Sequence, residues 1–533
     1  MKVLKIVNKI LKYVIFISIF FMLIGITYSF FVAGLTGVET DTTITMDSGN
    51  MDIVYSSGPA INATGLAPSD TSFGTKNFTI TGTSTIDLSE MNYKISLVID
   101  ENTLSKNAIS FKLTSTNTSG NGMVVPSIEE DIYVGTNNIE LGIGKFIGPV
   151  NNAVHTYQMK FYFYETNTDQ SNDINKNFKA HVSIESYNNP CVTGECLKDK
   201  ILAQGGGAAA IEAKGNPNFT VISTESDTGL YAMEDEYGTS YYYRGNKNIL
   251  NNNLIFGEFQ WKIIRINGDG SIRIMYNGTK EQFNQNDTMN DIGEETVLGF
   301  YSYSSIYNDN KYVGYMYGGP KGVASTQRHG FTSSAATFNE TDSDAKEQLD
   351  LWYKQSFLDK TFENKIADNL FCNDRQFVEE ILGKNIKDPG YGQFYASYAP
   401  RYRIYTAKTP TLKCKQQNDQ FTVTKRSLGN GSLKYPVGLI TIDEVMMAGL
   451  IYGTQNVDNY LFVELPFHTM SPYAFFDGSA EATIWGVGYH ANISGSLVTR
   501  TIEYDSLRPV INLKSDVVVT GEGTLTNPYQ VID

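Results

Sequence analysis

Basic residues are scarce in this chain. Its 42 lysine and arginine residues face 57 aspartate and glutamate residues, a formal net charge of −15 over 533 residues. A surface with this excess of negative charge offers no broad basic face to nucleic acid. It is typical of a soluble, self-repelling protein. We therefore expect no nucleic-acid partner.

Histidine and cysteine are also rare, with five and four residues. The chain contains neither a GxSxG elbow nor an HExxH zinc motif. A catalytic triad of Ser471, His468 and Asp477 has no distinguishing spacing. Cys191 and Cys196 form a C-x4-C pair without a second close pair or a histidine at ligand spacing, which disfavours zinc. The sequence therefore predicts no catalytic site, no metal and no cofactor.

Long hydrophobic runs are absent except for one, from Tyr13 to Leu35, which carries no charge. About 20 apolar residues span a bilayer, and the four lysines in residues 1–12 place the N-terminus in the cytoplasm. A cleaved signal peptide is the alternative, but its apolar core is only ~7–15 residues long. The longer run favours an uncleaved anchor at residues 13–35, and cleavage near residues 30–34 stays open. We expect a single-pass membrane protein with its C-terminal bulk outside the cell.

The four cysteines suit an exported chain, because disulfides form in oxidising compartments. Four cysteines allow three pairings. The simplest joins the neighbours Cys191 and Cys196 and, separately, Cys372 and Cys414.

Aromatic residues are abundant, at 12% of the chain, and the fold class that we predict is mainly β with some α. Residues 36–187 contain several segments in which apolar side chains alternate with polar ones. In one of them Met91, Tyr93, Ile95 and Leu97 fall on the same face. Alternation of this kind indicates half-buried strands. We predict an antiparallel β-sandwich, jelly-roll-like, in this region.

The order of parts over residues 14–187 resembles the TasA/camelysin family of exported bacterial β proteins. The resemblance rests on "TYSFF", "NMDIVYS", "GLAPSDTSFGTKNFTITGT", "FYFYETNTDQ" and "FKAHVSIES". Some members assemble into fibres, so it implies a fibre- or envelope-forming function as one alternative. The long anchor and the large C-terminal region depart from the family. We expect the domain to serve as a stalk.

Residues 188–217 form a predicted linker. "CLKDKILAQ" is typical of a short helix, which Gly205–Gly207 would end, and "AAAIEAKG" of another helical turn. A ring as small as that between Cys191 and Cys196 removes little chain entropy, so it would act as a local clip.

Residues 218–533 form the predicted C-terminal domain. Residues 259–276 predict a hairpin around "NGDGS". Its Arg265 and Arg273 would pair with Glu258 or face solvent. A helix would begin after Ser343, break near residues 358–360 and continue over 362–370. Its Trp/Phe stripe favours a core position over a ligand site.

A third helix would start at a Thr441–Glu444 capping box and end at Gly453. In "FCNDR" we expect Asp374 to pair with Arg375 or to cap a turn.

Residues 225–533 resemble an uncharacterised bacterial domain whose fold is that of C-type lectins and formylglycine-generating enzymes. The resemblance rests on "YYYRG", "WKIIRINGDGSIRIMY", "VGYMYG", "FCNDR", "YPVGLITIDEVMMAG", "MSPYAFF" and "LRPVINLKSDVVVTGEGTLTNPYQV". It implies an α+β, C-type-lectin-like domain whose final strand pairs back into the central sheet. Arg508 would then anchor a buried carboxylate or backbone carbonyls. Pro509 would stand where the strand begins, because a missing donor is tolerated there.

The same resemblance implies a formylglycine-type enzyme as a second alternative. Those enzymes hold copper with two cysteines near the C-terminal end of the domain. No cysteine follows Cys414 here, which disfavours that chemistry.

Non-catalytic recognition or adhesion is the leading functional prediction. Ligand sites concentrate on loops carried by a rigid sheet, and exposed aromatic rings can stack on sugars or fill pockets of a partner protein. We predict a glycan or protein ligand at the richest loop region, or a core position for most of its aromatic residues. The candidate ligand-binding residues are Tyr473, Phe475, Phe476, Trp485, Tyr489 and His490. The predicted location is the bacterial cell membrane, with the bulk of the chain extracellular.

Overall fold

The computed structural model describes residues 42–46, 51–85, 90–105, 108–166, 169–187, 191, 196–325, 338–377, 396–426, 428–476, 481–499 and 506–532. Over these residues the protein is mainly β, and its sheets are antiparallel with one parallel pairing. None of the helices described is long and apolar enough to span a membrane. The predicted anchor at residues 13–35 and the stub at 1–12 lie outside the described residues. The chain divides into two compact units, the first made of residues 1–189 with 425–427 and the second of residues 190–424 with 428–533.

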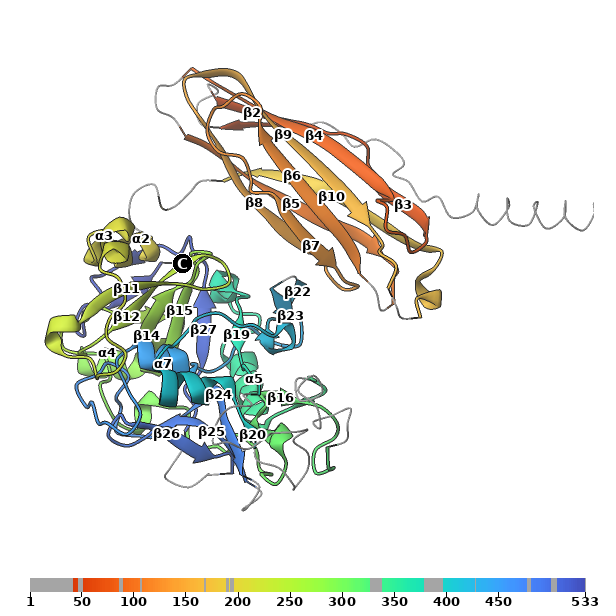
Figure 1. The fold of residues 1–533 in the computed structure, drawn as a ribbon. Coiled ribbons are helices and arrows are strands. Elements are labelled where there is room, and N and C mark those ends of the chain that lie inside the picture. Colours follow the sequence, from red (N-terminus) through yellow and green to blue (C-terminus); the bar gives the residue numbers. More distant parts are fainter. Residues whose placement is uncertain are drawn as a thin grey trace, which may run out of the picture. The chain divides into compact units, whose positions relative to one another are not determined.

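The first unit is a sandwich of two antiparallel sheets (Figure 1). One sheet has the strand order β1 (Thr42–Met46), β2 (Met51–Ser56), β4 (Gly74–Ser84), β9 (Val150–Tyr162), β6 (Ile109–Asn117) and β7 (Ile128–Ile132). The other has the order β3 (Ile61–Leu66), β10 (Lys176–Ser186), β5 (Glu90–Asn102) and β8 (Asn138–Ile147).

The predicted alternation of apolar side chains is confirmed in this unit. Met91, Tyr93, Ile95 and Leu97 on β5 are all 0% exposed, and they join a single core with apolar residues of both sheets. Side chains of a strand alternate between its faces, so one face of each sheet is buried and the other stays polar.

The second unit is built on a larger sheet. Its order is β18 (Ile366–Ala367), β27 (Val510–Leu513), β15 (Ile272–Thr279), β14 (Phe259–Ile266), β13 (Asn253–Phe256), β29 (Tyr529–Val531) and β28 (Val519–Thr520). The hairpin of β11 (Gly229–Glu234) and β12 (Thr239–Arg244) joins it through β14. The predicted hairpin is β14–β15. The central strands are buried on both faces, because helices and loops cover them.

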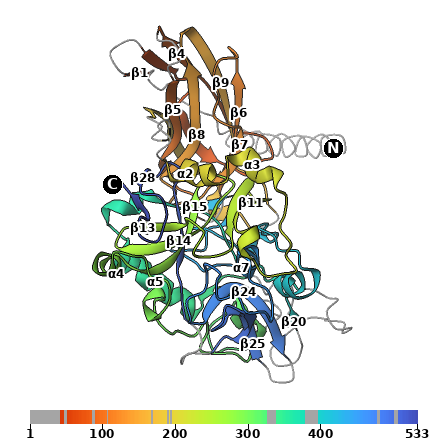
Figure 2. The ribbon, with the colours of Figure 1, turned by 90° about the vertical axis from the view of Figure 1, so that its left-hand side faces the viewer.

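A second sheet of this unit has the order β20 (Ala396–Ser397), β24 (Phe467–Phe476), β25 (Glu481–Val487) and β26 (Ile493–Leu497). In both views α7 (Ile442–Met447) lies between this sheet and the larger one (Figures 1 and 2). Two-stranded pairs are β16 (Met316–Tyr317) with β17 (Thr341–Asp342), β19 (Phe371–Cys372) with β21 (Gln420–Phe421), and β22 (Lys425–Arg426) with β23 (Gly429–Asn430). The remaining helices are α2 (Leu197–Gln204), α3 (Ala208–Ala213), α4 (Lys280–Asn286), α5 (Asp344–Ser356) and α6 (Ala399–Arg401), with a π-helical turn at Tyr402–Ala407.

The helix starts agree with the sequence predictions better than the helix ends. Ser343 caps α5 by accepting a hydrogen bond from the Lys346 N–H, and the Thr441–Glu444 capping box starts α7. The predicted helix over residues 362–370 is wrong, because Thr361–Lys365 is a 3-10 turn that leads into β18. β18 pairs with β27, so the sheet takes the backbone hydrogen bonds of that segment.

The predicted end of α7 at Gly453 is also wrong. The helix stops at Met447, and Gly449 has a φ of 107°. A side chain at Gly449 would place its Cβ 2.2 Å from the Ser223 hydroxyl oxygen. The close packing of these two segments therefore ends the helix early.

Both predicted disulfides are confirmed. Cys191 bonds to Cys196 and Cys372 to Cys414. The second bond ties β19 to the segment that precedes β21.

Arg508 and Pro509 occupy the predicted positions. Pro509 directly precedes β27, a position at which the ladder does not need a backbone N–H donor, which proline lacks. The guanidinium of Arg508 is 1% exposed and donates to the carbonyls of Tyr276 and Leu461 at 3.2 and 3.1 Å and to Asn277 Oδ1 at 3.0 Å. Burial among neutral acceptors lowers the pKa of Arg508 to about 9. The alternative of anchoring backbone carbonyls is the one observed.

Candidate functional site

Two buried arginines face each other at the centre of the larger sheet. Arg265 on β14 is the cross-strand neighbour of Arg273 on β15, and they are 6% and 1% exposed. Like charges directly opposite each other destabilise a sheet. Glu444 compensates, because its Oε1 lies 3.0 Å from Arg265 Nε and 2.7 Å from Arg273 Nε. The predicted pairing with Glu258, or exposure to solvent, is therefore wrong.

The start of α7 positions Glu444. In the capping box its Oε2 accepts the Thr441 N–H at 2.9 Å, while Oε1 reaches the arginines. Burial opposes ionisation of Glu444, but Arg273 and Arg265 outweigh it and hold its pKa below the ordinary value. The carboxylate is thus charged and shared between the helix and the sheet.

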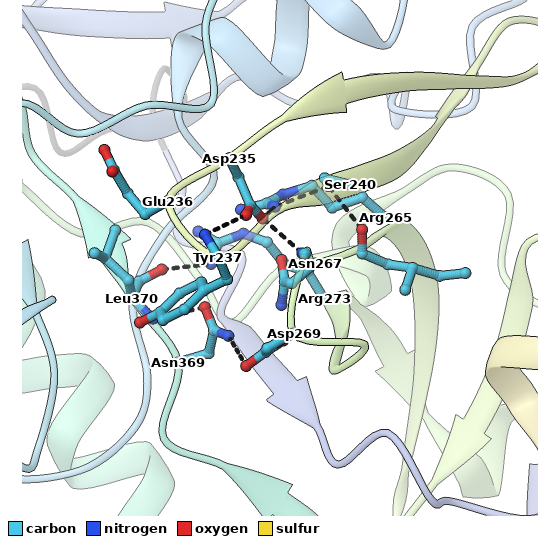
Figure 3. A network of polar contacts seen from close by, with 12 residues as sticks. Asp235, Glu236, Tyr237, Ser240, Arg265, Asn267, Asp269, Arg273, Asn369 and Leu370 are labelled. Atoms are coloured by element: carbon cyan, nitrogen blue, oxygen red, sulfur yellow. Dashed lines mark hydrogen bonds and ion pairs between the residues drawn. The ribbon is translucent and has the colours of Figure 1, made fainter. Parts of the chain in front are cut away.

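Asp235 adds a second carboxylate to this network by pairing with Arg265 (Figure 3). Its Oδ2 accepts from Arg265 Nη1 and from the Gly268 N–H at 2.9 and 2.8 Å, and its Oδ1 accepts from the Tyr237 and Gly238 N–H groups. Asp235 was not among the site residues predicted from the sequence. The sequence held one signal that could have indicated it: Asp235 is a carboxylate between the end of strand β11 and a turn.

A second ion-pair network surrounds Arg403. The guanidinium binds Asp443 in a bidentate manner, with distances of 2.9 and 2.8 Å, and lies 2.7 Å from Asp374. The predicted pair of Asp374 with Arg375 is wrong, since Arg375 pairs with Asp419 at 2.6 Å. Asp374 has a φ of 51°, in the left-handed region. Burial raises the pKa of Asp374, and Arg403 opposes that rise.

Both networks line one pocket of about 30 Å³. A space of roughly 10–15 Å³ is enough for one water molecule, so the pocket has room for about two waters and is too small for an organic ligand. Its charged groups bind one another and join α7 to the sheet. Their arrangement supports a structural role. The lining residues include Arg265, Arg273, Cys372, Asp374, Arg403, Thr441, Asp443, Glu444 and Ser471.

The predicted aromatic site divides into core and surface. Phe475 and Trp485 are 0% exposed, so they belong to the core. Tyr473 and Phe476 are half-buried, and Tyr489 and His490 are exposed. The structure brings three of the six together: the ring centroids of Tyr473 and Trp485 lie 4.6 Å apart, and those of Tyr473 and Phe476 lie 6.1 Å apart.

Residues from other segments extend this cluster to the surface. Tyr405, in the π-helical turn, and Tyr452, after α7, are 48% and 36% exposed, and their rings meet edge to face at 4.8 Å. Tyr452 contacts Trp485 at 6.0 Å, and the guanidinium of Arg401 lies 4.7 Å from the Tyr473 ring centroid. We call Arg401, Tyr405, Tyr452 and Tyr473 the tyrosine patch. Sequence reasoning missed Arg401, Tyr405 and Tyr452, because their segments are far from the predicted loop.

The residues considered for catalysis or metal binding do not form a recognisable site. His468 is buried beside the Tyr303 ring, and Ser471 Oγ accepts the Ile442 N–H. Asp477 lies outside the described residues. Cys191, Cys196 and Asp199 are close enough together for a metal, but the disulfide occupies both sulfur atoms.

No protein-family model and no curated protein matches this chain. Among solved structures, the chain is similar to the enzymatically active domain of tailspike protein 4 from bacteriophage CBA120. The identity is 13%, the match covers 29% of this chain and 19% of that chain, and the TM-score is 0.12. A likeness of this degree carries no argument about fold or activity.

Proposed function

We propose that the protein is a non-catalytic recognition or adhesion protein of the bacterial surface. Residues 13–35 anchor it in the membrane, and both units lie outside the cell. The first unit is a jelly-roll-like stalk of the TasA/camelysin type. The second is a C-type-lectin-like head that binds its ligand through the tyrosine patch.

The observation that carries this proposal is the exposure of the tyrosine patch. Tyr405 and Tyr452 keep 48% and 36% of their surface accessible, although Tyr452 contacts the buried Trp485 and Tyr405 packs against Tyr452. Tyrosine and arginine are enriched among residues that dominate binding energy at protein interfaces. Rings held by packing lose little conformational entropy upon binding. The composition of the patch favours a protein partner over a glycan.

The second unit also supports a non-catalytic role. Its charged pocket has a volume of about 30 Å³, and the charged groups that line it pair with one another. All four cysteines are in disulfides, which supports a structural rather than a redox function.

The test is binding of the labelled full-length protein to intact bacterial cells. The double variant Tyr405→Ala/Tyr452→Ala should lose at least about tenfold in affinity, the loss of two anchors of 1 kcal/mol or more each. Tyr307→Ala is the matched control, because Tyr307 is 43% exposed and lies outside the patch. Protease treatment of the cells should abolish binding, whereas periodate oxidation of surface glycans should not.

Unchanged binding of the double variant would exclude the tyrosine patch. Loss of binding after periodate alone would identify a glycan ligand instead of a protein.

A further inference from the structure

Helix α5 has one buried face and one open face. Leu349, Tyr353 and Phe357 point into the core and are 0 to 1% exposed, while Leu351 is 49% exposed. A hollow lies on each side of Leu351, and Leu351 lines both. The outer face of this helix is therefore a groove with a central ridge.

The first hollow has a volume of about 120 Å³ and an aromatic and amide lining. Gln348, Trp352 and Gln355 are spaced by four and three residues, so they share one helix face. Trp352 is half-buried, and its ring meets that of Trp261 at 6.2 Å and that of Phe357 at 5.5 Å. The indole is thus held in a fixed orientation. Leu298, Tyr301 and Leu351 complete the lining.

The second hollow, of about 310 Å³, combines an aromatic ring with charged groups. Tyr435 stacks on the buried Tyr353 at 5.1 Å, which fixes its ring. Lys346 Nζ lies 3.1 Å from Asp342 Oδ2 and 2.8 Å from Asp350 Oδ2. Asp350 is only 9% exposed, and its Oδ1 accepts no hydrogen bond from the described residues. The remaining lining residues are Glu347, Leu351, Lys354 and Lys434.

The charges around the second hollow balance. The lining carboxylates of Asp342, Glu347 and Asp350 are matched by the lining ammonium groups of Lys354 and Lys434 and by that of the buried Lys346, which is outside the lining but pairs with Asp342 and Asp350. A balanced site does not select a polyanion or a polycation. It offers donors and acceptors in equal measure, and glutamine amides supply both.

The groove also differs from a protein interface. A stable interface buries about 800 Å² on each partner around an apolar core. Among the described residues that line the two hollows, Leu351 is the single large apolar side chain that is strongly exposed. Concave sites with aromatic walls and a few placed polar groups are typical of small polar ligands.

We propose that the outer face of α5 is a carbohydrate-binding groove with one subsite on each side of Leu351, for a neutral oligosaccharide. A sugar ring offers an apolar C–H face to Trp352 and Tyr435. Its hydroxyl groups donate to carboxylates and accept from amides and ammonium groups. The groove shares no residue with the tyrosine patch, so it is a second site that does not rest on the function proposed above.

The experiment is calorimetric titration of the full-length protein with neutral tetrasaccharides of glucose, mannose, galactose and N-acetylglucosamine, and with a heparin-derived tetrasaccharide. We expect at least one neutral sugar to bind and the sulfated one not to bind. The double variant Gln348→Ala/Gln355→Ala should weaken binding about tenfold or more, because two hydrogen-bonding amides are lost. Gln285→Ala is the matched control, an exposed glutamine on α4.

Trp352→Ala should abolish binding, but Trp352 also packs in the core, so the glutamine variants decide the outcome. Absence of binding by all four neutral sugars at millimolar concentration overturns the proposal. So does binding by the heparin fragment alone, or wild-type affinity in the glutamine double variant. Loss of sugar binding in Tyr405→Ala but not in the glutamine variants moves the sugar site to the tyrosine patch.

Discussion

Glu444 is the side chain on which the charge balance of the larger sheet depends. It separates two arginines that the register places directly opposite each other, and it is itself 3% exposed. Neither arginine can reach bulk water, so the carboxylate is their local counter-charge together with Asp235. A buried ion pair contributes little net stability when intact, but removing one partner leaves an uncompensated charge.

We therefore expect Glu444→Gln to lower the free energy of unfolding by about 3–5 kcal/mol. Urea denaturation followed by tryptophan fluorescence measures the change. Glu258→Gln is the control, because Glu258 is exposed on the neighbouring turn and should change stability by less than about 0.5 kcal/mol. Equal effects of the two substitutions would contradict the role assigned to Glu444.

His155 stands at the centre of a buried hydrogen-bond chain in the first unit. Its Nε2 lies 2.7 Å from the Asn121 carbonyl oxygen, which only accepts, so Nε2 carries the proton. Nδ1 then accepts from the Tyr93 hydroxyl at 2.5 Å, and the Tyr93 oxygen lies 2.7 Å from that of Tyr157. Burial lowers the pKa of His155 from 6.5, and the hydrogen bond to Asn121 opposes that change.

A lowered pKa makes the first unit less stable in acid. Below pH 6.5 the unfolded chain takes up a proton at His155 that the folded chain does not, so stability falls as the pH drops through 6.5 toward the folded pKa. Above pH 6.5 this group contributes no pH dependence. Thermal melts between about pH 7.5 and about pH 5 should show this loss, and His155→Gln should show less of it. A wild-type slope in His155→Gln would contradict the role assigned to this histidine.

Among the elements, the helices show where local signals suffice. A cap is a contact between residues three apart, so Ser343 and the Thr441–Glu444 box were readable from the sequence. The ends depended on distant segments: β27 for residues 361–367, and Ser223 for the segment after α7. A glycine can end a helix for reasons of backbone conformation, of space, or of both.

Gly449 and Gly453 separate these reasons. Both have positive φ values, 107° and 73°, but a Cβ would lie 2.2 Å from Ser223 Oγ at Gly449 and would meet nothing within 4 Å at Gly453. We expect Gly453→Ala to cost about 1 kcal/mol for the backbone alone, and Gly449→Ala to cost about 2–5 kcal/mol because the clash adds to it. Chemical denaturation of the two variants measures the difference. Similar costs would mean that Ser223 moves aside freely.

Over the described residues each unit has one large hydrophobic core, and the second unit has in addition a small cluster of Tyr242, Leu412 and Met447. Neither core draws on the other unit, and both disulfides belong to the second unit. Scanning calorimetry should therefore show two unfolding transitions. Replacing the cysteines should lower the temperature of one of these transitions, that of the second unit.

The size of each shift follows from the length of chain that the disulfide closes. The bonded cysteines are 42 residues apart for Cys372–Cys414 and 5 apart for Cys191–Cys196. Loop-closure entropy then predicts losses of about 4 and about 2 kcal/mol for the paired Cys→Ser variants, if the folded state is unstrained. Both should lower the same transition, with the larger shift for Cys372→Ser/Cys414→Ser. A shift in both transitions would contradict separate cores.

The linear order of residues was enough for features with a local physical cause. Alternating apolar side chains produce a half-buried strand wherever they occur, so the sandwich core around Tyr93 was readable in advance. The bond between the neighbours Cys191 and Cys196, the helix caps and the proline before β27 depended on near neighbours or on the backbone chemistry of one residue, and Cys372 and Cys414 were then the pair that remained.

The partners of buried ion pairs could not be predicted from the sequence. A buried charge pairs with whichever opposite charge the packing brings within about 4 Å. Glu444 serves Arg265 and Arg273 from 179 and 171 positions away in the chain, and Asp374 pairs with Arg403 rather than with its neighbour. The tyrosine patch and the groove on α5 have the same origin. Folding brings several separate segments together to form each surface.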